Sequence, residues 1–151
     1  MAENPMTDKE YSMTKLFIKN YAKINVFFYK LTNGKFMGKL AGREVMLVTM
    51  TGAKSGKEIT IPLMYVPHND GVILVGSLGG APKDPLWVKS VRANPDVDVQ
   101  YKANKMQLRA RQADDAEKAD VWPICVEHYA EYADYQKRTD RNIPVFICEP
   151  R

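Results

Sequence analysis

The sequence contains few of the residues that would by themselves mark a metal site or a membrane protein. Only two cysteines and two histidines occur among 151 residues, so a zinc site built from four such ligands at motif spacing is not expected. No apolar run approaches the ~20 residues of a membrane-spanning helix. The opening stretch MAENPMTDKEYS is polar and lacks the apolar core of a signal peptide. We therefore expect free thiols, no metal and a reducing, cytoplasmic setting.

Two common nucleotide-binding patterns are also absent. The dinucleotide fingerprint G-x-G-x-x-G does not occur, and the stretch MTGAKSGKE at positions 50–58 lacks the spacing of a Walker loop. Gly52 and Gly56 permit positive φ, so the backbone N–H groups of this loop could cradle an anion. Lys54 and Ser55 would then add a charge and a hydroxyl. The alternative is a plain hairpin loop with solvent-facing lysines.

Composition is that of one globular domain. Hydrophobic residues make up 45% and charged residues 26%, both ordinary values. The net charge of +4 suits an anionic small ligand, an anionic membrane surface or nucleic acid, and does not choose among them. We expect residues 1–13 to form a flexible N-terminal segment and residues 14–151 a single domain.

Hydrophobic periodicity predicts an N-terminal helix followed by short strands. Strands are expected at residues 45–50, 58–66, 71–77, 97–101, 107–111 and 143–148, and further helices at 86–93 and 114–137. The strands cluster and are joined by turns rather than alternating with helices, which disfavours a doubly wound parallel sheet. We predict an α+β fold, a small antiparallel barrel with helices at its rim.

The N-terminal helix, predicted over residues 14–31, has a broad apolar stripe. Phe17, Tyr21, Ile24, Phe28 and Leu31 recur at helical spacing. The stripe would most simply pack in the core. Alternatively, it lies on a membrane surface or lines an apolar substrate pocket.

Local signals give the other helix ends. Asp84 is expected to cap the second helix, with Pro85 as its first residue. Asp114 should cap the C-terminal helix, and Pro123 should interrupt it.

Aromatic and polar side chains mark a second candidate region. Tyr129, Tyr132 and Tyr135 stand three residues apart and would share one helix face. They would form either an aromatic seam against the barrel or the wall of a pocket for a flat organic molecule, with one hydroxyl donating a hydrogen bond or a proton. Ser77, at a strand end beside a glycine pair, and Trp87, just inside a helix, could face the same molecule.

Together these segments resemble a known family, the deazaflavin-dependent nitroreductases, also described as F420-dependent quinone reductases of the split β-barrel, flavin-reductase-like group. The similar stretches include TMTGAKSGKEITIPL, GVILVGSLGGAPKDPLWVKSVRANPDVDVQ and YAEYADYQKRTDRNIPVFICEP, and span residues 16–150. The resemblance implies an FMN-binding split-barrel-like fold that holds reduced 8-hydroxy-5-deazaflavin, coenzyme F420. It also implies hydride transfer from that cofactor to a quinone, an activated enone or a nitroaromatic acceptor.

The resemblance further implies which positions form the site. Cofactor contacts are expected from a loop, the strand after it, a later strand end and a helix start, namely Ala53, Lys54, Ser55, Ile59, Thr60, Ile61, Pro62, Leu63, Met64, Val75, Gly76, Ser77, Leu78, Leu86, Trp87, Val88, Lys89 and Ser90, together with Tyr132. Acceptor contacts are expected from Met64, Tyr129, Tyr132 and Tyr135. The catalytic candidates are Ser77, Tyr129 and Tyr135. Relatives usually have arginine at position 53, so Ala53 removes one donor to the anionic cofactor tail.

Two other functions fit parts of the sequence. One is an FMN-binding flavin reductase on the same barrel. The other is a non-enzymatic basic barrel that binds nucleic acid through exposed aromatics on strands, which the helical placement of most tyrosines disfavours. The expected partner is a small hydrophobic acceptor such as a quinone or enone, with peripheral membrane contact through the first helix as a further option and no nucleic acid.

Overall fold

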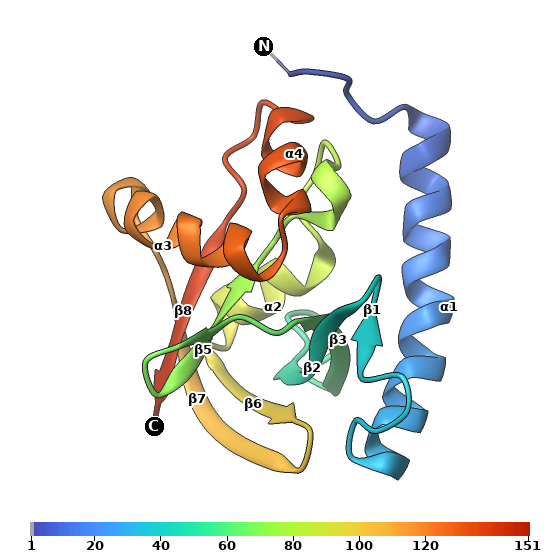
Figure 1. Cartoon of the computed structure of the whole chain (residues 1–151), viewed down its shortest axis with the longest axis vertical. Coiled ribbons are helices and arrows are strands. Elements are labelled where there is room, and N and C mark those ends of the chain that lie inside the picture. The colour runs from blue at the N-terminus through green and yellow to red at the C-terminus, as the bar shows by residue number, and fades with distance from the viewer. Residues whose placement is uncertain (1) are drawn as a thin grey trace.

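A curled antiparallel sheet runs through the molecule, with helices around it (Figure 1). The computed structural model describes residues 2–151. The elements are α1 (Asp8–Thr32), β1 (Lys39–Leu40), β2 (Arg43–Thr51), β3 (Glu58–Met64), β4 (Pro67–His68), β5 (Gly71–Val75), a short 3-10 turn (Leu78–Gly80), α2 (Leu86–Ala93), β6 (Asp96–Tyr101), β7 (Asn104–Gln112), α3 (Asp115–His128), α4 (Glu131–Lys137) and β8 (Val145–Pro150). The strand order is β1-β2-β6-β7-β8-β5-β4, and β3 also pairs with β2. This confirms the predicted α+β split barrel.

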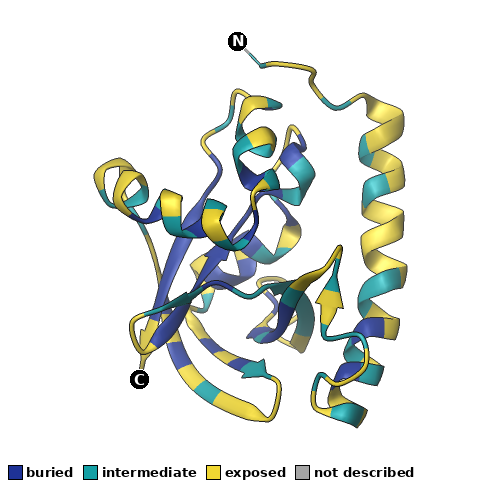
Figure 2. Ribbon diagram, in the orientation of Figure 1, coloured by how far each residue is buried: buried dark blue, intermediate teal, exposed yellow. Residues whose placement is uncertain are grey.

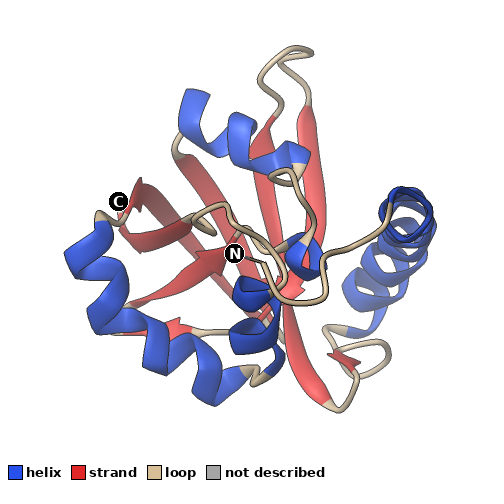
Figure 3. Cartoon of the chain, turned by 90° about the horizontal axis from the view of Figure 1, so that it is seen from above, coloured by secondary structure: helices blue, strands red, loops and turns tan. Residues whose placement is uncertain are grey.

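Strand β5, which lies between β8 and β4, shows how the sheet divides the core. Its five residues, GVILV, are all buried, although side chains alternate between the two faces of a strand. Val72 and Leu74 join one apolar cluster with α2. Ile73 and Val75 join another with α3 and α4. A strand covered on both faces reads as a continuous apolar run, and Figure 2 shows β5 as buried. Seen from above, helices lie on opposite sides of the strands (Figure 3).

The first helix begins earlier than expected. It starts at Asp8 rather than at residue 14, because Thr7 and Glu10 form a reciprocal capping box that satisfies the first free N–H groups. Glu3 N–H donates to Lys137 O at 2.6 Å and Arg138 Nε donates to Asn4 O at 3.1 Å, so the residues before the helix touch the end of α4. The flexible segment and its boundary with the domain stay a prediction.

The face that α1 turns toward the barrel also differs from the prediction. Phe17, Ile24 and Leu31 are 61%, 53% and 70% exposed, so the expected core stripe points outward. The buried residues are Asn25 and Tyr29. The Tyr29 hydroxyl accepts from Lys102 N–H at 2.7 Å and donates to Val45 O at 3.2 Å. Tyr29 therefore fixes the helix both through these hydrogen bonds and through apolar packing with Val45 and Leu47.

Two predicted helix signals were wrong. Pro85 is itself the N-cap of α2 and makes no side-chain cap, because the Asp84 carboxylate pairs with Arg141 instead. Pro123 lies inside α3, where it costs one helical hydrogen bond without ending the helix. The break falls at Tyr129, the C-cap of α3. None of the helices within residues 2–151 is long and apolar enough to cross a membrane.

Candidate functional site

The loop between β2 and β3 is a tightly closed hairpin. Gly52 N–H donates to Lys57 O at 2.8 Å and Gly56 N–H donates to Gly52 O at 3.0 Å. A side chain at Gly52 would stand 2.6 Å from Ser55 Oγ, and Gly56 has a φ of +67°. Two of the N–H groups expected to cradle an anion are therefore used inside the loop. Any anion held here must depend mainly on the lysine side chains.

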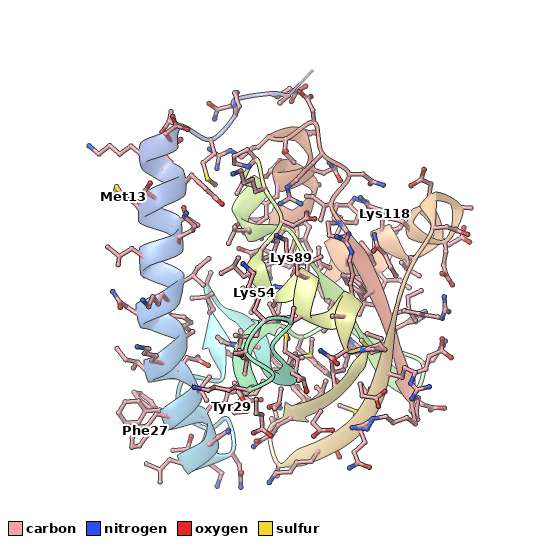
Figure 4. The ribbon with its side chains drawn as sticks, turned by 180° about the vertical axis from the view of Figure 1, so that it is seen from behind. Met13, Phe27, Tyr29, Lys54, Lys89 and Lys118 are labelled. Atoms are coloured by element: carbon pink, nitrogen blue, oxygen red, sulfur yellow. The ribbon has the colours of Figure 1, made fainter. Side chains whose placement is uncertain are left out.

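One hydrogen bond ties this loop to α2. Ala53 N–H donates to Ser90 Oγ at 3.2 Å, and Ser90 is buried. Lys54 on the loop and Lys89 on α2 consequently lie on the same side of the molecule (Figure 4). Lys54, Lys57 and Lys89 are exposed, and no carboxylate within residues 2–151 forms a salt bridge with any of them. Three lysines without a carboxylate partner therefore lie on this loop and on the adjacent α2.

The turn after β5 begins with a buried serine. Ser77 is 7% exposed, and its hydroxyl forms no hydrogen bond with any other residue that the structure describes. Leu78 takes a left-handed φ of +44°, and Gly79 and Gly80 follow with φ of +64° and +79°. A non-glycine residue in this region is uncommon and strained. Ser77 therefore lies at the start of a sharp, strained turn.

Close packing joins the loop and the turn through α2. A Cβ at Gly76 would stand 2.9 Å from the Val88 side chain on α2. A Cβ at Gly80 would stand 2.6 Å from Tyr135 O on α4. Ser90 on the same α2 accepts a hydrogen bond from Ala53. The loop at residues 52–57 (the lysine loop), the turn at residues 77–81 (the serine turn) and α4, which carries Tyr132 and Tyr135, therefore form one connected region.

The three tyrosines come together across a break between helices. Tyr129 caps the end of α3, whereas Tyr132 and Tyr135 lie on α4. The ring centroids of Tyr129 and Tyr132 are 4.9 Å apart, and the hydroxyls of Tyr129 and Tyr135 are 2.9 Å apart. The sequence predicted the cluster but placed it on one helix face.

Burial favours the neutral, donating form of Tyr129 and Tyr132 by raising their pKa values. Burial, followed by the hydrogen bond with Tyr135, raises the pKa of Tyr129 well above its usual value. Burial also raises the pKa of Tyr132, which is 4% exposed and packs with Val121 and Cys125. Tyr132 is therefore mainly part of the core, while Tyr129 and Tyr135 carry the paired hydroxyls.

The predicted cofactor strand and helix divide into accessible and core residues. All of Ile59–Met64 pairs with β2, with Thr60 Oγ 2.8 Å from Thr49 Oγ, and β3 is only partly buried. Met64 packs against both the tyrosine cluster and the Tyr29 cluster. By contrast, Val75 and Val88 are buried in the core, so only their backbone could reach a ligand. The expected positions that stay in reach include Ile59, Ile61, Leu63 and Trp87, which are half-buried or exposed, and Leu86, which is 85% exposed.

Sequence reasoning missed Arg141. Its side chain is 15% exposed, and its guanidinium donates to Ala81 O, Gly76 O, Ser77 O and Asp84 Oδ1. Burial lowers its pKa, against the opposing effect of the Asp84 carboxylate. The residue stands in a stretch that supports the family resemblance, TDRNIP, but its partners are about sixty positions earlier in the chain. No local sequence pattern identifies these hydrogen-bond partners of Arg141.

Other features hold none of the predicted site residues. A surface hollow lined by His68, Arg111, Glu117 and Glu149, among others, lies between β4–β5 and α3. Burial raises the pKa of Cys125 to about 12, so its thiol is a poor nucleophile. Within residues 2–151 no group of three or more potential ligands could hold a metal ion.

Comparisons with known proteins agree on one family. Residues 21–150 match the family described as F420H(2)-dependent quinone reductase. An F420H(2)-dependent quinone reductase of Mycobacterium tuberculosis is 35% identical over 127 residues, which cover 82% of this chain and 85% of that protein. The solved structure of an F420-H2 dependent reductase, FDR-A, is 47% identical with a TM-score of 0.65, covering 70% of this chain and 93% of that one. A structure described as a domain-swapped dimer is 41% identical with a TM-score of 0.68, covering 84% and 96%.

Proposed function

The chain belongs to the F420H(2)-dependent quinone reductase family, and we propose that it is an oxidoreductase that uses reduced F420 to reduce a quinone, an activated enone or a nitroaromatic compound. The observation that carries this proposal is the position of α2. Through Ser90 it holds the lysine loop, and through Val88 it packs on the turn of Ser77. The anionic tail of the cofactor and its reacting ring could thus both bind in this one connected region, the tail at the lysine loop and the ring beside the serine turn.

The loop and α2 suit the anionic part of the cofactor. Lys54, Lys57 and Lys89 have no carboxylate partner within residues 2–151, so each is free to pair with phosphate or carboxylate oxygens. When bound, F420H2 supplies the hydride. The chain's own residues bind the tail, orient the ring and limit the access of water.

The serine turn and the tyrosine cluster suit the acceptor. The free hydroxyl of Ser77 and the paired hydroxyls of Tyr129 and Tyr135 can donate hydrogen bonds to an acceptor oxygen. Such donors stabilise negative charge that develops there during hydride transfer. A phenol that stays neutral at physiological pH can also pass its proton to that oxygen, provided that solvent replaces it. Tyrosine rings and Met64 would form the apolar wall.

The direct test is oxidation of F420H2 on addition of an acceptor. We expect the purified protein to restore the absorbance of oxidised F420 when menadione is added, and to do so more slowly when Ser77 is replaced by Ala. A panel of quinones, enones and nitroaromatics would rank the acceptors. No oxidation with any member of the panel would reject the proposed activity.

An FMN-binding flavin reductase is the remaining enzymatic alternative. Flavin that copurifies with the protein, together with tight binding of added FMN, would favour it. The family comparison supports F420 instead, and it gives no support to a nucleic-acid-binding barrel.

We also propose that the outer face of α1 lies on an anionic membrane surface. Met13, Leu16, Phe17, Ile24, Phe27 and Leu31 are each more than half exposed. They share one side of the helix, and Met13 and Phe27 point away from the barrel (Figure 4). Lys15, Lys19, Lys23 and Lys30 lie along the same helix, and residues 11–33 contain no Asp or Glu. An apolar stripe beside lysines is typical of helices bound at a lipid interface.

Sedimentation with vesicles tests this contact. Binding to vesicles containing phosphatidylglycerol, little binding to pure phosphatidylcholine, and loss of binding in the Phe27→Ser, Leu31→Ser variant would support it. No binding to either vesicle would contradict it, as would a stable dimer, measured by light scattering, that the same variant converts to a monomer.

The enzyme itself is proposed to be cytoplasmic, since both buried cysteines are free thiols.

A further inference from the structure

Arg141 holds the backbone on both sides of the serine turn. Its Nη2 donates to Ser77 O at 2.6 Å and its Nη1 to Gly76 O at 3.1 Å. Its Nε donates to Ala81 O at 2.8 Å. A single planar group therefore binds the chain immediately before, at and after the turn. The three carbonyls belong to residues that lie outside the α-helices and strands.

The turn needs such a partner because its conformation is strained. Leu78 has a φ of +44°, where a residue with a side chain is held only if its surroundings fix it. The turn makes two short-range hydrogen bonds of its own, from Gly80 N–H to Ser77 O and from Ala81 N–H to Leu78 O. Its further support includes the hydrogen bond from Gly76 N–H to Pro144 O at 2.9 Å, the packing of Gly80 on Tyr135 and the guanidinium of Arg141.

Arg141 in turn is fixed by Asp84. The carboxylate Oδ1 of Asp84 accepts from Nη1 at 2.8 Å. Its other oxygen lies 3.7 Å from Arg92 Nη1, on α2, the helix that also holds the lysine loop. The geometry of the serine turn is therefore connected to α2 by a second route besides the contact between Gly76 and Val88.

We propose that Arg141 is the positioning residue of the acceptor site, and that its guanidinium sets the orientation in which the hydroxyl of Ser77 meets the acceptor. The inference rests on the proposed function, because it requires Ser77 to act on the acceptor. Arg141 itself is not expected to touch the acceptor, since four of its five N–H donors are already occupied by three carbonyls and a carboxylate. Lysine cannot replace it, because an ammonium lacks the rigid planar fork.

A double-mutant cycle tests this inference. We expect Arg141→Lys to lower kcat with a quinone about ten- to hundredfold, the loss typical of a misplaced reacting group, while the dissociation constant for F420 changes less than about threefold. Adding Arg141→Lys to Ser77→Ala should lower kcat little further, because both changes remove the same contact. Arg111→Lys is the matched control, an arginine with two carboxylate partners outside the site, and should leave kcat unchanged.

The outcomes separate the inference from the function on which it rests. If Ser77→Ala leaves kcat unchanged, the proposed role of Ser77 fails. If Ser77→Ala lowers kcat but Arg141→Lys lowers it by the same factor in both backgrounds, Arg141 acts through general stability and the inference is overturned. If Arg141→Lys weakens F420 binding as much as it lowers kcat, Arg141 is not specific to the acceptor side. Partial recovery of an Arg141→Ala variant by added guanidinium would support the proposal, and recovery equal to that with added ammonium would contradict it.

Discussion

At the scale of single residues, the site depends on side chains whose charges or hydroxyls lack partners within the chain. Lys54, Lys57 and Lys89 form no salt bridge within residues 2–151, whereas Arg109 and Arg111 on β7 are paired with carboxylates. The hydroxyl of Ser77 is likewise without a partner among the described residues, although the residue is buried. In the described part of the chain, unpaired lysines also occur elsewhere on the surface, such as Lys105 on β7. What marks the proposed site is that unpaired lysines and an unpaired buried hydroxyl lie in one connected region.

Lys54→Ala should weaken cofactor binding more than turnover. One exposed charge pair contributes up to about 1 kcal/mol, so the dissociation constant for F420 should rise about two- to fivefold, and less at high salt because the pair is screened. Fluorescence titration measures it, with Lys105→Ala, an exposed lysine on β7, as control. Equal losses in both variants would mean that the effect is only one of net charge.

Ala53→Arg should strengthen binding of the same cofactor. The backbone of Ala53 is fixed by Ser90 and its side chain is exposed, so a longer side chain can extend without displacing the core. A guanidinium can bind phosphate or carboxylate in a bidentate manner. The dissociation constant for F420 should fall, and that for a tail-free deazaflavin should not change. A similar gain for both ligands would place the effect at the ring rather than the tail.

The tyrosine hydroxyls should act as a pair. Tyr129→Phe and Tyr135→Phe should each lower kcat while leaving F420 affinity nearly intact, because both hydroxyls are proposed to donate to the acceptor. The double variant should be little worse than either single one, since the two groups share one hydrogen bond of 2.9 Å. Steady-state kinetics measures this, and fully multiplicative losses would argue that the hydroxyls act separately.

At the scale of the elements, close approach between segments far apart in the sequence sets the site. The turn at residues 77–81 meets α4 at Gly80, the loop at residues 52–57 meets α2 at Ala53, and α2 meets Gly76, the residue after β5. The glycines at positions 76 and 80 allow contacts that a Cβ would prevent. The elements were predictable from the sequence, but these contacts were not.

Gly80→Ala should destabilise the protein more than Gly42→Ala. The two glycines have nearly the same φ, +79° and +77°, but a Cβ at Gly80 would stand 2.6 Å from Tyr135 O, whereas nothing lies within 4 Å at Gly42. The positive φ alone costs about 1–2 kcal/mol, so Gly42→Ala should cost that much and Gly80→Ala should exceed about 3 kcal/mol. Urea unfolding measures both. Equal costs would show that the contact between the turn and α4 is not tight.

The first helix shows where sequence patterns succeed and fail. Periodicity found α1 but not its orientation, because the helix has apolar residues on two sides and its buried face contains Asn25 and Tyr29. The capping box at Thr7 and Glu10 was readable from the sequence, yet the polar opening residues suggested a loose segment. Pro123 misled for a related reason, since a proline permits a helix when other contacts hold it.

At the scale of the whole molecule, the fold and the family were predictable, and the connections inside the site were not. Short strands joined by turns indicate the split barrel. The stretches around TGAKSGKE, Ser77 and the tyrosines resemble the family and indicate its cofactor. Arg141 could not be assigned a role, because its partners at residues 76–84 follow only from the three-dimensional path of the chain.

Stability should decline in alkaline solution. Burial raises the pKa of both Cys125 and Cys148 to about 12, above the value of about 8.5 for a thiol in an unfolded chain. Above that lower value the unfolded state loses protons that the native state keeps. The stabilisation is therefore complete below about pH 8.5 and falls by about 1.4 kcal/mol per pH unit for each thiol as the pH rises toward 12. Tyr129 and Tyr132 add to the loss above about pH 10.

Urea unfolding at pH 8 and pH 10.5 measures this dependence. Cys148→Ala, although less stable at every pH because it leaves a small cavity, should show a shallower decline than the original chain. A free energy of unfolding that does not change between the two pH values would contradict the burial of the thiols.

The most direct test of the central claim is a fluorescence titration of the purified protein with F420 and, separately, with FMN. The connected region formed by the lysine loop, α2 and the serine turn is proposed to recognise a deazaflavin with an anionic tail. We therefore expect saturable binding of F420 that weakens with salt and in the Lys54→Ala variant, and much weaker binding of FMN. Tighter binding of FMN than of F420, or no binding of F420, would contradict the account.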